Sequence, residues 1–355
     1  MKILAVIPAR SGSKSVKDKN IRQFNGKPML AHSIAHARES KYINRIIVST
    51  DSEQYAQIAN AYGAETPFLR PKEISGDFSL DIEVFEHALS FLEEQEGYIP
   101  DIVVQLRPTY PIRDASDIDN MIKLLIDNDD ADSVRCIAPA REIAHKMWYY
   151  NEEGYITPIM KDIPEAYNMP RQVLPKVYYQ NACIDAIRAN VITGQHSMSG
   201  TKIMGYQMKH NFDIDTEEEF QAAESFSKLE SGNQTFVFDI DGVVAQFRED
   251  LEYKSALPNQ NIIDVINYLY EHNNYIVLFT ARGYKTGIDW LAVTAGQMRQ
   301  WGVKYHELKF GKPSADFYID DKMLSLDTLY RFSELLHITG NKAGCHNADC
   351  GQPGK

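Results

Sequence analysis

Short apolar runs alternate along this chain with longer amphipathic stretches, and this alternation restricts the folds open to it. Runs rich in Val and Ile begin near residue 3, end at Thr50 and at Leu106, and surround Cys136. The stretches between them have helical periodicity over residues 28–38, 52–62, 81–95 and 116–127. Strands separated by helices predict an α/β fold with a mostly parallel sheet, in which ligands bind at the carboxyl ends of the strands.

A second alternation of the same kind begins after a polar stretch at residues 228–234. It runs through the apolar strand TFVF, a helix over residues 260–272, the strand YIVLFT, a helix before Trp301, the strand ADFYID and a final helix. A chain of 355 residues also favours two cores over one. We therefore predict one domain over residues 1–230, a second over residues 234–340 and a solvated tail over residues 341–355.

The net charge of −12 at pH 7 argues against the broad basic surface of proteins that bind nucleic acid or anionic membranes nonspecifically. No apolar run is long enough for a membrane span or a signal-peptide core, so we expect a cytoplasmic protein. Four cysteines do not make a disulfide framework, and Cys136 and Cys183 are expected to be reduced core residues. Cys345, His346 and Cys350 are candidate metal ligands, but their Gly-rich setting favours a solvated tail.

A basic segment rich in small residues follows the first strand. It contains four cations and four small residues: Arg10, Lys14, Lys17, Lys19, Ser11, Gly12, Ser13 and Ser15. Small residues let backbone N–H groups approach an anion, and cations neutralise the charge of a triphosphate. The pattern alone fits a phosphate site and a basic surface loop equally well, and it lacks the spacing of an ATPase P-loop.

Asp213 and Asp215 lie two residues apart in the segment DIDTEEEF. In an extended segment, carboxylates at this spacing project to the same side and can share a magnesium ion with phosphate oxygens. Asp215 or Thr216 followed by glutamates is also good chemistry for a helix start, which is the structural alternative.

Taken together, these blocks resemble the cytidylyltransferase family of acylneuraminate synthetases and their relatives for other nonulosonic acids. The resemblance covers roughly residues 1–228. It rests on blocks in the family's order: IPARSGSKSVKDKN, NGKPML, IIVSTDSEQ, FLRPKEISGD with SLD, QLRPTYPIRD, PRQVLPKVYYQNACI and DIDTEEEF. It implies a Rossmann-like nucleotidyltransferase domain that uses CTP, an acidic sugar and Mg²⁺.

The resemblance also implies a role for each matching residue. The CTP phosphates would be surrounded by Arg10, Ser13, Lys14, Lys19 and Asn20, and Lys19 would stabilise the transition state. Arg70 and Asp77 would fix the cytidine, and Asp213 and Asp215 would place the metal. The sugar and its carboxylate would be held by Gln105, Lys146 and Arg171, with Asn181 and Asp185 as further binding residues.

Two positions depart from the family's pattern. Ser15 stands where a Gly is common, and Asp185 stands where an aromatic residue is common. The second change lies at the sugar end of the pocket, so a sialic, legionaminic or pseudaminic type of sugar, or a 3-deoxy-octulosonate, stays open as the substrate. The family resemblance further implies a homodimer in which residues 145–185 reach the partner's site.

Polar residues follow the strands of the second half in the same way. They are Asp239 and Asp241 in TFVFDIDG, Thr280 in LFTAR, Lys309 and Lys312 in KFGKPSAD, and Asp320 and Asp321 in FYIDDK. All would meet at the carboxyl edge of one parallel sheet. This ordered set resembles the haloacid dehalogenase superfamily of phosphatases, and the short spacing between Asp241 and Thr280 implies a capless member.

By that second resemblance Asp239 would be the nucleophile that forms an aspartyl-phosphate, and Asp241 would be the general acid and base. Thr280 would bind phosphoryl oxygens and Lys312, rather than Lys309, would stabilise their charge. Mg²⁺ would be held by Asp239 and Asp241 together with Asp320 and Asp321.

The leading hypothesis joins the halves. The phosphatase removes phosphate from a phosphorylated sugar, and the transferase activates the product, with fusion raising the local concentration of the intermediate. The alternatives are that the second domain serves another pathway step, or that it is a noncatalytic oligomerisation module.

Overall fold

A computed structural model of the protein describes residues 1–13, 16–140, 142–208, 212–230, 232–246, 253–315, 324–330 and 332–333. The chain forms two compact units, Met1–Glu219 and a second that begins at Phe220. The division falls inside helix α6 (Glu217–Glu230), earlier than the polar stretch in which the sequence places it. Phe226 of α6 explains this difference, because its ring packs on Phe332 of the second unit at 5.1 Å between centroids.

The described part of the first unit is built on a six-stranded sheet with the strand order β10-β6-β9-β5-β1-β4. All adjacent pairs are parallel except those made by β9, which is antiparallel to β5 and β6. The strands are β1 (Ile3–Pro8), β4 (Arg45–Ser49), β5 (Ile102–Leu106), β6 (Ser133–Pro139), β9 (Tyr178–Arg188) and β10 (Ile203–Gln207). A separate two-stranded piece pairs β2 (Gln23–Phe24) with β3 (Lys27–Pro28). The expectation of a mostly parallel α/β sheet is confirmed.

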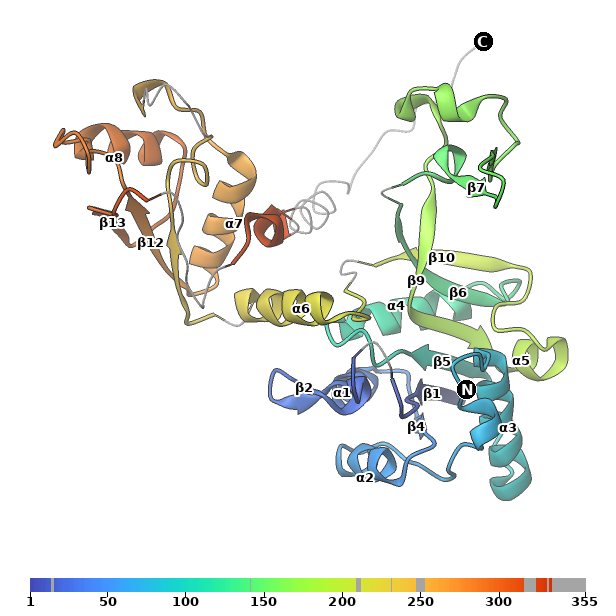
Figure 1. Ribbon diagram of the computed structural model, residues 1–355. Coiled ribbons are helices and arrows are strands. Elements are labelled where there is room, and N and C mark those ends of the chain that lie inside the picture. The colour runs from blue at the N-terminus through green and yellow to red at the C-terminus, as the bar shows by residue number, and fades with distance from the viewer. Residues whose placement is uncertain are drawn as a thin grey trace, which may run out of the picture. The chain divides into compact units, whose positions relative to one another are not determined.

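Helices cover both faces of this sheet, which gives three layers (Figure 1). Apolar residues of α1 (Met29–Glu39), α2 (Glu53–Ala61) and α4 (Ala115–Ile126) join one core cluster with the sheet. Those of α3 (Asp81–Glu96) and α5 (Ala189–Gln195) join a second cluster on the other face. The four helices expected from periodicity between the first strands are present within two residues of their expected ends.

Residues 140–177, which we call the lobe, leave the sheet between β6 and β9 and stand away from it (Figure 1). The lobe contains the hairpin β7 (Trp148–Tyr150) and β8 (Ile156–Pro158) and the short 3-10 turns η3 (Ala144–Lys146), η4 (Ala166–Asn168) and η5 (Arg171–Val173). A small core of Ile143, Ala166 and Leu174 holds it together. Its surface exposes large apolar side chains, among them Tyr149, Tyr150, Tyr155 and Val173.

The second unit contains a parallel sheet in the order β11-β12-β13 within its described residues. The strands are β11 (Thr235–Phe238), β12 (Tyr275–Thr280) and β13 (Glu307–Phe310), and the helices are α7 (Gln260–Glu271), α8 (Leu291–Gln300) and the turn η6 (Tyr253–Ser255). The sequence did not predict β13, because ELKF is too short for a clear period. The expected strand at ADFYID, the end of the final helix and the tail at 341–355 lie outside the described residues.

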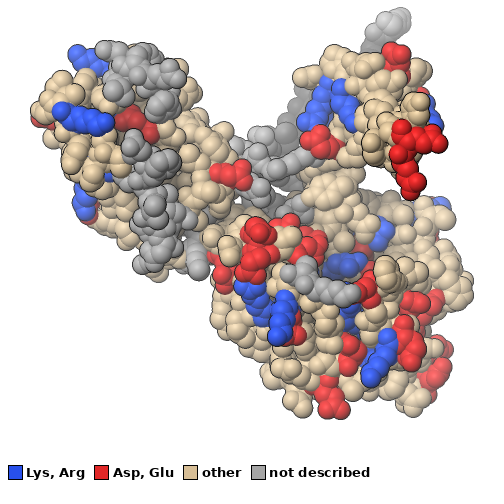
Figure 2. All heavy atoms as spheres, in the orientation of Figure 1, with Lys and Arg blue, Asp and Glu red and all other residues tan. Residues whose placement is uncertain are grey.

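No helix in the described part of the chain is long and apolar enough to cross a membrane. On the face of the protein that Figure 2 shows, basic and acidic side chains of the first unit are interspersed, with no single basic field. This agrees with the acidic net charge.

His36 of α1 gives the first unit a pH dependence that can be measured. Burial, and after it the nearby Arg113, lower the pKa of His36 from 6.5 to about 3. Below pH 6.5 the unfolded chain therefore takes up a proton that the folded chain does not. We expect the free energy of unfolding to fall by about 2 kcal/mol between pH 7.5 and pH 5 from this group. Urea unfolding of the wild type and of His36→Gln at both pH values measures it, and an equal pH effect in the two proteins would contradict it.

Candidate active site

The basic segment after β1 is tied to the loop that follows β4. The backbone N–H and Oγ of Ser11 donate to the Asp51 carboxylate at 2.7 and 2.8 Å. Gly12 has a φ of +74°, a conformation that Gly adopts without strain. Arg10 forms an ion pair with Asp77 at 2.8 Å, and Asn20 donates to the Arg10 carbonyl at 3.0 Å. Arg10, Asn20 and Asp77, all expected around the nucleotide, thus lie together. Ser13 is on the same segment, and Lys14 lies outside the described residues.

Lys19 meets Asp215, which is 196 residues away in the sequence, at 2.7 Å from Nζ to Oδ1. Lys19 lies in the 3-10 turn η1 (Lys19–Ile21) and is 7% exposed. Two further contacts fix the partner segment: Ile214 N–H donates to the Thr109 carbonyl just beyond β5 at 3.0 Å, and Arg22 pairs with Glu217. The structure therefore brings a buried cation and the Asp213–Asp215 segment to the carboxyl edge of β1 and β5.

Thr216, and not Asp215, caps the start of α6. The Thr216 Oγ1 accepts from the Glu219 N–H at 3.2 Å, and the Glu219 carboxylate accepts from the N–H groups of Asp215 and Thr216 at 2.8 and 2.9 Å. This is a reciprocal capping box. It leaves the Asp215 carboxylate available for Lys19 and for a ligand.

Asp213 carries an oxygen whose bonding is incomplete. Its Oδ1 is buried and has no hydrogen-bond partner among the described residues. Burial, with the nearby Asp215 carboxylate adding to it, raises the pKa of Asp213. A cation would complete this oxygen, although the described residues contain no group of three or more His, Cys, Asp or Glu side chains placed to hold a metal.

Arg70 is a second residue with unmet bonding. It is 5% exposed, and its Nε and Nη2 atoms have no hydrogen-bond partner among the described residues. Burial lowers the pKa of Arg70. Buried guanidinium donors without acceptors are costly, which favours an acceptor from a bound ligand.

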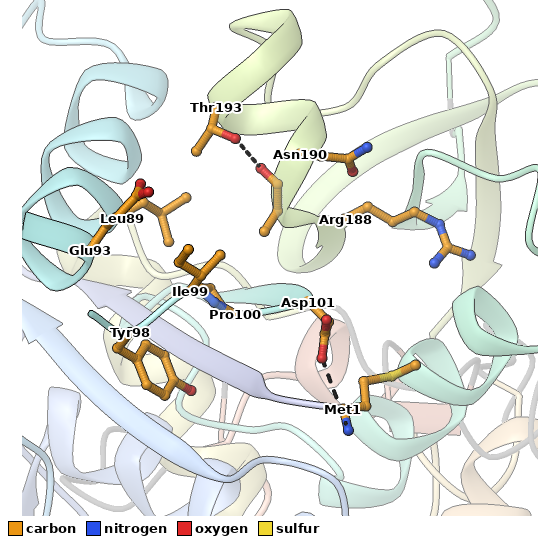
Figure 3. Close-up of a pocket in the computed structure, with 11 residues that line it drawn as sticks. Met1, Leu89, Glu93, Tyr98, Ile99, Pro100, Asp101, Arg188, Asn190 and Thr193 are labelled. Atoms are coloured by element: carbon orange, nitrogen blue, oxygen red, sulfur yellow. Dashed lines mark hydrogen bonds and ion pairs between the residues drawn. The ribbon is translucent and has the colours of Figure 1, made fainter. Parts of the chain in front are cut away.

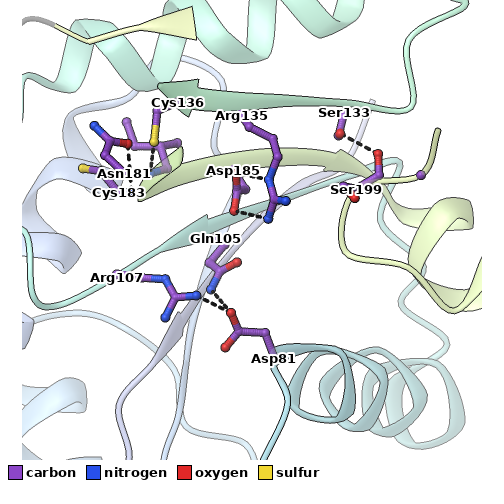
Figure 4. Close-up of polar contacts among 12 residues, drawn as sticks. Asp81, Gln105, Arg107, Ser133, Arg135, Cys136, Asn181, Cys183, Asp185 and Ser199 are labelled. Atoms are coloured by element: carbon purple, nitrogen blue, oxygen red, sulfur yellow. Dashed lines mark hydrogen bonds and ion pairs between the residues drawn. The ribbon is translucent and has the colours of Figure 1, made fainter. Parts of the chain in front are cut away.

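A row of charged and polar side chains crosses the sheet beside these residues (Figure 4). Gln105 on β5 lies opposite Asp185 on β9, which in turn lies opposite Arg135 on β6. Arg135 and Asp185 form two hydrogen bonds, 2.9 and 3.1 Å long. At the start of α3, Asp81 accepts from Gln105 at 3.1 Å and pairs with Arg107. We call these five residues the charged row.

Stability does not account for the charged row. Asp185 is 1% exposed, and its neighbours on the same face of β9 and β5, Ile187 and Val103, belong to the apolar core. Burial raises the pKa of Asp185, with Arg135 opposing it. A buried ion pair of this kind is often no more stabilising than apolar residues of the same volume. Gln105 lies near the carboxyl end of β5, where parallel sheets bind ligands, and this favours a binding role for the row.

The sequence analysis gave roles to Gln105 and Asp185 but none to Asp81, Arg107 or Arg135. Signals were available for Asp81, which ends the block SLD, and for Arg107, which stands two residues after Gln105 in the block QLRPTYPIRD. Asp81 and Arg135 lie inside a predicted helix and a predicted strand. Their nearness to the site depends on strand register, which no local pattern gives.

The lobe holds Lys146 and Arg171, two residues expected to bind the sugar. The Nζ of Lys146 donates to the Tyr167 carbonyl at 3.0 Å, within the lobe. Arg171 lies in η5 and is exposed. The contacts described for these two residues do not include Lys19, Asp213 or Asp215. Asn181 is 3% exposed, and its backbone carbonyl accepts from the Tyr110 hydroxyl.

In the second unit, the candidate residues gather at the carboxyl ends of the three described strands. Lys312 pairs with Asp239, and the backbone N–H of Lys312 donates to the Thr280 carbonyl at 3.2 Å. Lys309 instead pairs with Glu307 on its own strand at 2.6 Å. Asp320 and Asp321 lie outside the described residues.

Arg282 holds Asp241 in this second site. Its Nε and Nη2 donate to the Asp241 carboxylate at 2.7 to 3.1 Å, and its Nη1 donates to Thr294 and Gln297 at 3.2 and 2.7 Å. The guanidinium side chain is 0% exposed. The contacts make Arg282 a residue that positions Asp241.

A cavity of about 740 Å³ lies at the other edge of the first sheet (Figure 3). It is lined by Met1 and Asp101, which precede β1 and β5, and by Arg188 at the end of the antiparallel β9. It contains none of the candidate residues, which lie at the carboxyl ends of the parallel strands.

Comparisons with known sequences and structures point to one family. The sequence profile of a family described as cytidylyltransferase matches residues 4–255, which extends past the first unit. The post-translational flagellin modification protein B of Campylobacter coli is 32% identical over 228 residues, which are 64% of this chain and 95% of that protein. The CMP-N,N'-diacetyllegionaminic acid synthase of Campylobacter jejuni is 31% identical over 239 residues, 64% of this chain and 96% of that protein.

Other relatives are matched over a smaller part of their length. The N-acylneuraminate cytidylyltransferase of Escherichia coli is 43% identical over 123 residues, so the match spans 35% of this chain and 28% of that protein. Among solved structures, a CMP:2-keto-3-deoxy-manno-octonic acid synthetase complexed with CTP covers 65% of this chain and 100% of its own, with a TM-score of 0.50 and 16% identity. At that identity the likeness concerns the fold alone.

Proposed function

Since the chain belongs to the cytidylyltransferase family, we propose that it transfers CMP from CTP to an acidic sugar of the nonulosonic type and releases pyrophosphate. The observation that carries the proposal is the contact of the buried Lys19 with Asp215 beside the basic segment. This contact brings together, at one edge of the sheet, a cation that can neutralise phosphate charge and two carboxylates that can hold a metal ion.

The proposed reaction is a displacement at phosphorus. A hydroxyl oxygen of the sugar bonds to the α-phosphorus of CTP while its proton passes to solvent. The bond from that phosphorus to the oxygen bridging the α- and β-phosphates breaks, and pyrophosphate leaves. Lys19 neutralises charge that develops on the phosphate oxygens, and Arg10 and the N–H groups near Gly12 orient the chain of phosphates. Arg70, with its unpaired buried donors, is placed to bind a further acceptor of the nucleotide.

Mg²⁺ fits the donor set of Asp213 and Asp215. Both carboxylates are hard oxygen ligands, and the buried Oδ1 of Asp213 has no hydrogen-bond partner among the described residues. When bound, Mg²⁺ would neutralise phosphate charge. Asp213 and Asp215 would hold it, and Lys19 would share the negative charge of Asp215.

The sugar is an acidic one, and the names of the relatives include acylneuraminate, legionaminic and pseudaminic acid enzymes. We propose that Gln105 and the rest of the charged row bind it, with Lys146 and Arg171 holding its carboxylate. The last two would act across a homodimer, whose interface is supported by the exposed apolar side chains of the lobe. The alternative substrate is a 3-deoxy-octulosonate. We place the reaction in the cytoplasm.

We also propose that the second unit is a capless Mg²⁺-dependent phosphatase acting on a phosphorylated sugar. Asp239 attacks the phosphorus, the ester oxygen leaves with a proton from Asp241, and water then hydrolyses the aspartyl-phosphate. Thr280 and Lys312 bind the phosphoryl oxygens. The carboxylates of Asp239 and Asp241 fit Mg²⁺, as would Asp320 and Asp321. The pairing of Lys312, rather than Lys309, with Asp239 supports this assignment.

Pyrophosphate release tests both proposals together. Wild type and Asp239→Asn are given CTP, Mg²⁺ and a panel of nonulosonic acids and 3-deoxy-octulosonate, each free and phosphorylated. We expect a free sugar to react with both proteins and its phosphorylated form to react only with the wild type. Reaction of the octulosonate alone would favour the alternative substrate. Absence of pyrophosphate with every acidic sugar would contradict the transfer reaction itself.

A further inference from the structure

The charged row lies within the length of one sugar from the proposed reaction centre. Gln105 and Arg107 both bind Asp81, and two residues beyond Arg107 the Thr109 carbonyl holds Ile214, between Asp213 and Asp215. A strand advances about 3.3 Å per residue, so the four residues from Gln105 to Thr109 span at most about 13 Å. An acidic sugar whose reacting hydroxyl lies near Lys19 and Asp215 is therefore of a length to extend toward Gln105 and Arg107 with its far end.

The row is open to a ligand on one side and closed on the other. The side chains of Asp81 and Arg107 are each 34% exposed, and that of Arg135 is 23% exposed. Gln105 and Asp185, each 1% exposed, form the floor. A ligand can thus touch the row from the Asp81 side without any rearrangement of the sheet.

Two buried polar atoms of the row have unmet bonding. The Oε1 of Gln105 and the Nε of Arg107 have no hydrogen-bond partner among the described residues. One is an acceptor and the other is a donor. A hydroxyl group both donates and accepts, so it can satisfy either atom. A buried donor or acceptor without a partner carries an uncompensated loss of hydration, so a ligand that pairs with these atoms is favoured.

The charges of the row cancel. Two guanidinium groups, of Arg107 and Arg135, stand against two carboxylates, of Asp81 and Asp185. A neutral polar ligand group fits such a surface better than a second anion or a cation. An acylamino group can also donate and accept, but it brings a methyl group that would lie on charged atoms and remove them from water without a new bond.

We propose that the charged row binds the hydroxyl-bearing end of the sugar and makes the enzyme select acidic sugars with free hydroxyls there over sugars with acylamino groups. The inference rests on the proposed transfer of CMP to an acidic sugar. It assigns substrate selection to Asp81, Arg107 and Arg135 together with Gln105 and Asp185.

Two nonulosonic acids that differ at one carbon test the proposal. One carries a hydroxyl at C5, and the other, N-acetylneuraminic acid, carries an acetamido group there. The full chain is assayed for pyrophosphate release with CTP and Mg²⁺. We expect kcat/KM to be at least about tenfold higher for the hydroxyl sugar, the low end of what a small difference in one substrate group gives. Equal values, or a preference for the acetamido sugar, would overturn the inference while leaving the transfer reaction standing.

The double variant Arg135→Leu/Asp185→Leu then tests whether the row causes the preference. It removes both charges at once, so no buried charge is left unpaired. We expect the preference for the hydroxyl sugar to fall at least about fivefold while the KM for CTP stays within about twofold, the split expected for a residue that contacts only the sugar. Lys123→Leu/Asp127→Leu removes an exposed pair on α4 as the matched control and should leave the preference unchanged.

An unchanged preference in a folded Arg135→Leu/Asp185→Leu variant would overturn the assignment to these residues. If that variant does not fold, as shown by its melting curve, the same measurement on Asp185→Asn decides.

Discussion

Lys19→Met should lower kcat for pyrophosphate release by about 10³-fold, because it removes the buried cation that contacts Asp215. Methionine has nearly the length of lysine, so the local packing should survive. The loss should fall mainly on kcat, since the charge that Lys19 neutralises grows as the pyrophosphate leaves. Steady-state assays with CTP and the best sugar of the panel measure it.

Lys27→Met is the matched control for this loss. Lys27 lies on β3, close in sequence to Lys19, and its side chain is exposed. The same change of charge there should leave kcat within about twofold, as is usual for an exposed site. A comparable loss in both variants would mean that net charge matters more than the Lys19 contact. A kcat of Lys19→Met close to that of the wild type would contradict the role given to the Lys19–Asp215 pair.

Asp239→Asn should abolish phosphate release from a simple phosphate ester, by at least about 10³-fold, because the amide cannot attack phosphorus. Lys312→Met should lower the rate of phosphate release by a similar factor, since Lys312 pairs with Asp239. Lys309→Met is the control, because Lys309 pairs with Glu307 instead. Release of inorganic phosphate is followed with Mg²⁺ present.

Different outcomes separate the possible roles of the second unit. Phosphatase activity that survives in Asp239→Asn would assign the chemistry to another residue or to a contaminant. No activity in the wild type on any phosphate ester would favour a noncatalytic role for the unit. Pyrophosphate release with CTP and a free sugar should be unaffected in all three variants.

Periodicity was sufficient for most elements of the first unit. The helix expected at residues 81–95 spans Asp81–Glu96, because its apolar face and its glycine at residue 97 are both local signals. Strand β10 was missed. Its central residue is Gly205, which weakens a strand pattern, and the reason for a glycine is tertiary: a Cβ there would lie 2.8 Å from Ile137 Cδ1 on the neighbouring strand.

Local sequence patterns predicted less of the candidate sites than of the fold. Residue chemistry and order pointed to Arg10, Lys19, Asp213 and Asp215, but nothing local says that Lys19 touches Asp215. The charged row depends on the register of three strands, and the pairing of β6 with β9 shifts between Arg135 and Ile137. A shift of one residue would turn Asp185 to the other face of the sheet. Arg135 could therefore be assigned to the site only from the structure.

The way in which the lobe joins the sheet bears on how enzymes of this design diversify. The chain leaves at Pro139 and returns at Tyr178, and these two residues face each other in the β6–β9 pairing. Because exit and entry are adjacent, the intervening segment can be lengthened, shortened or exchanged without disturbing the strands beneath it. Sheet and lobe can thus accumulate mutations at different rates.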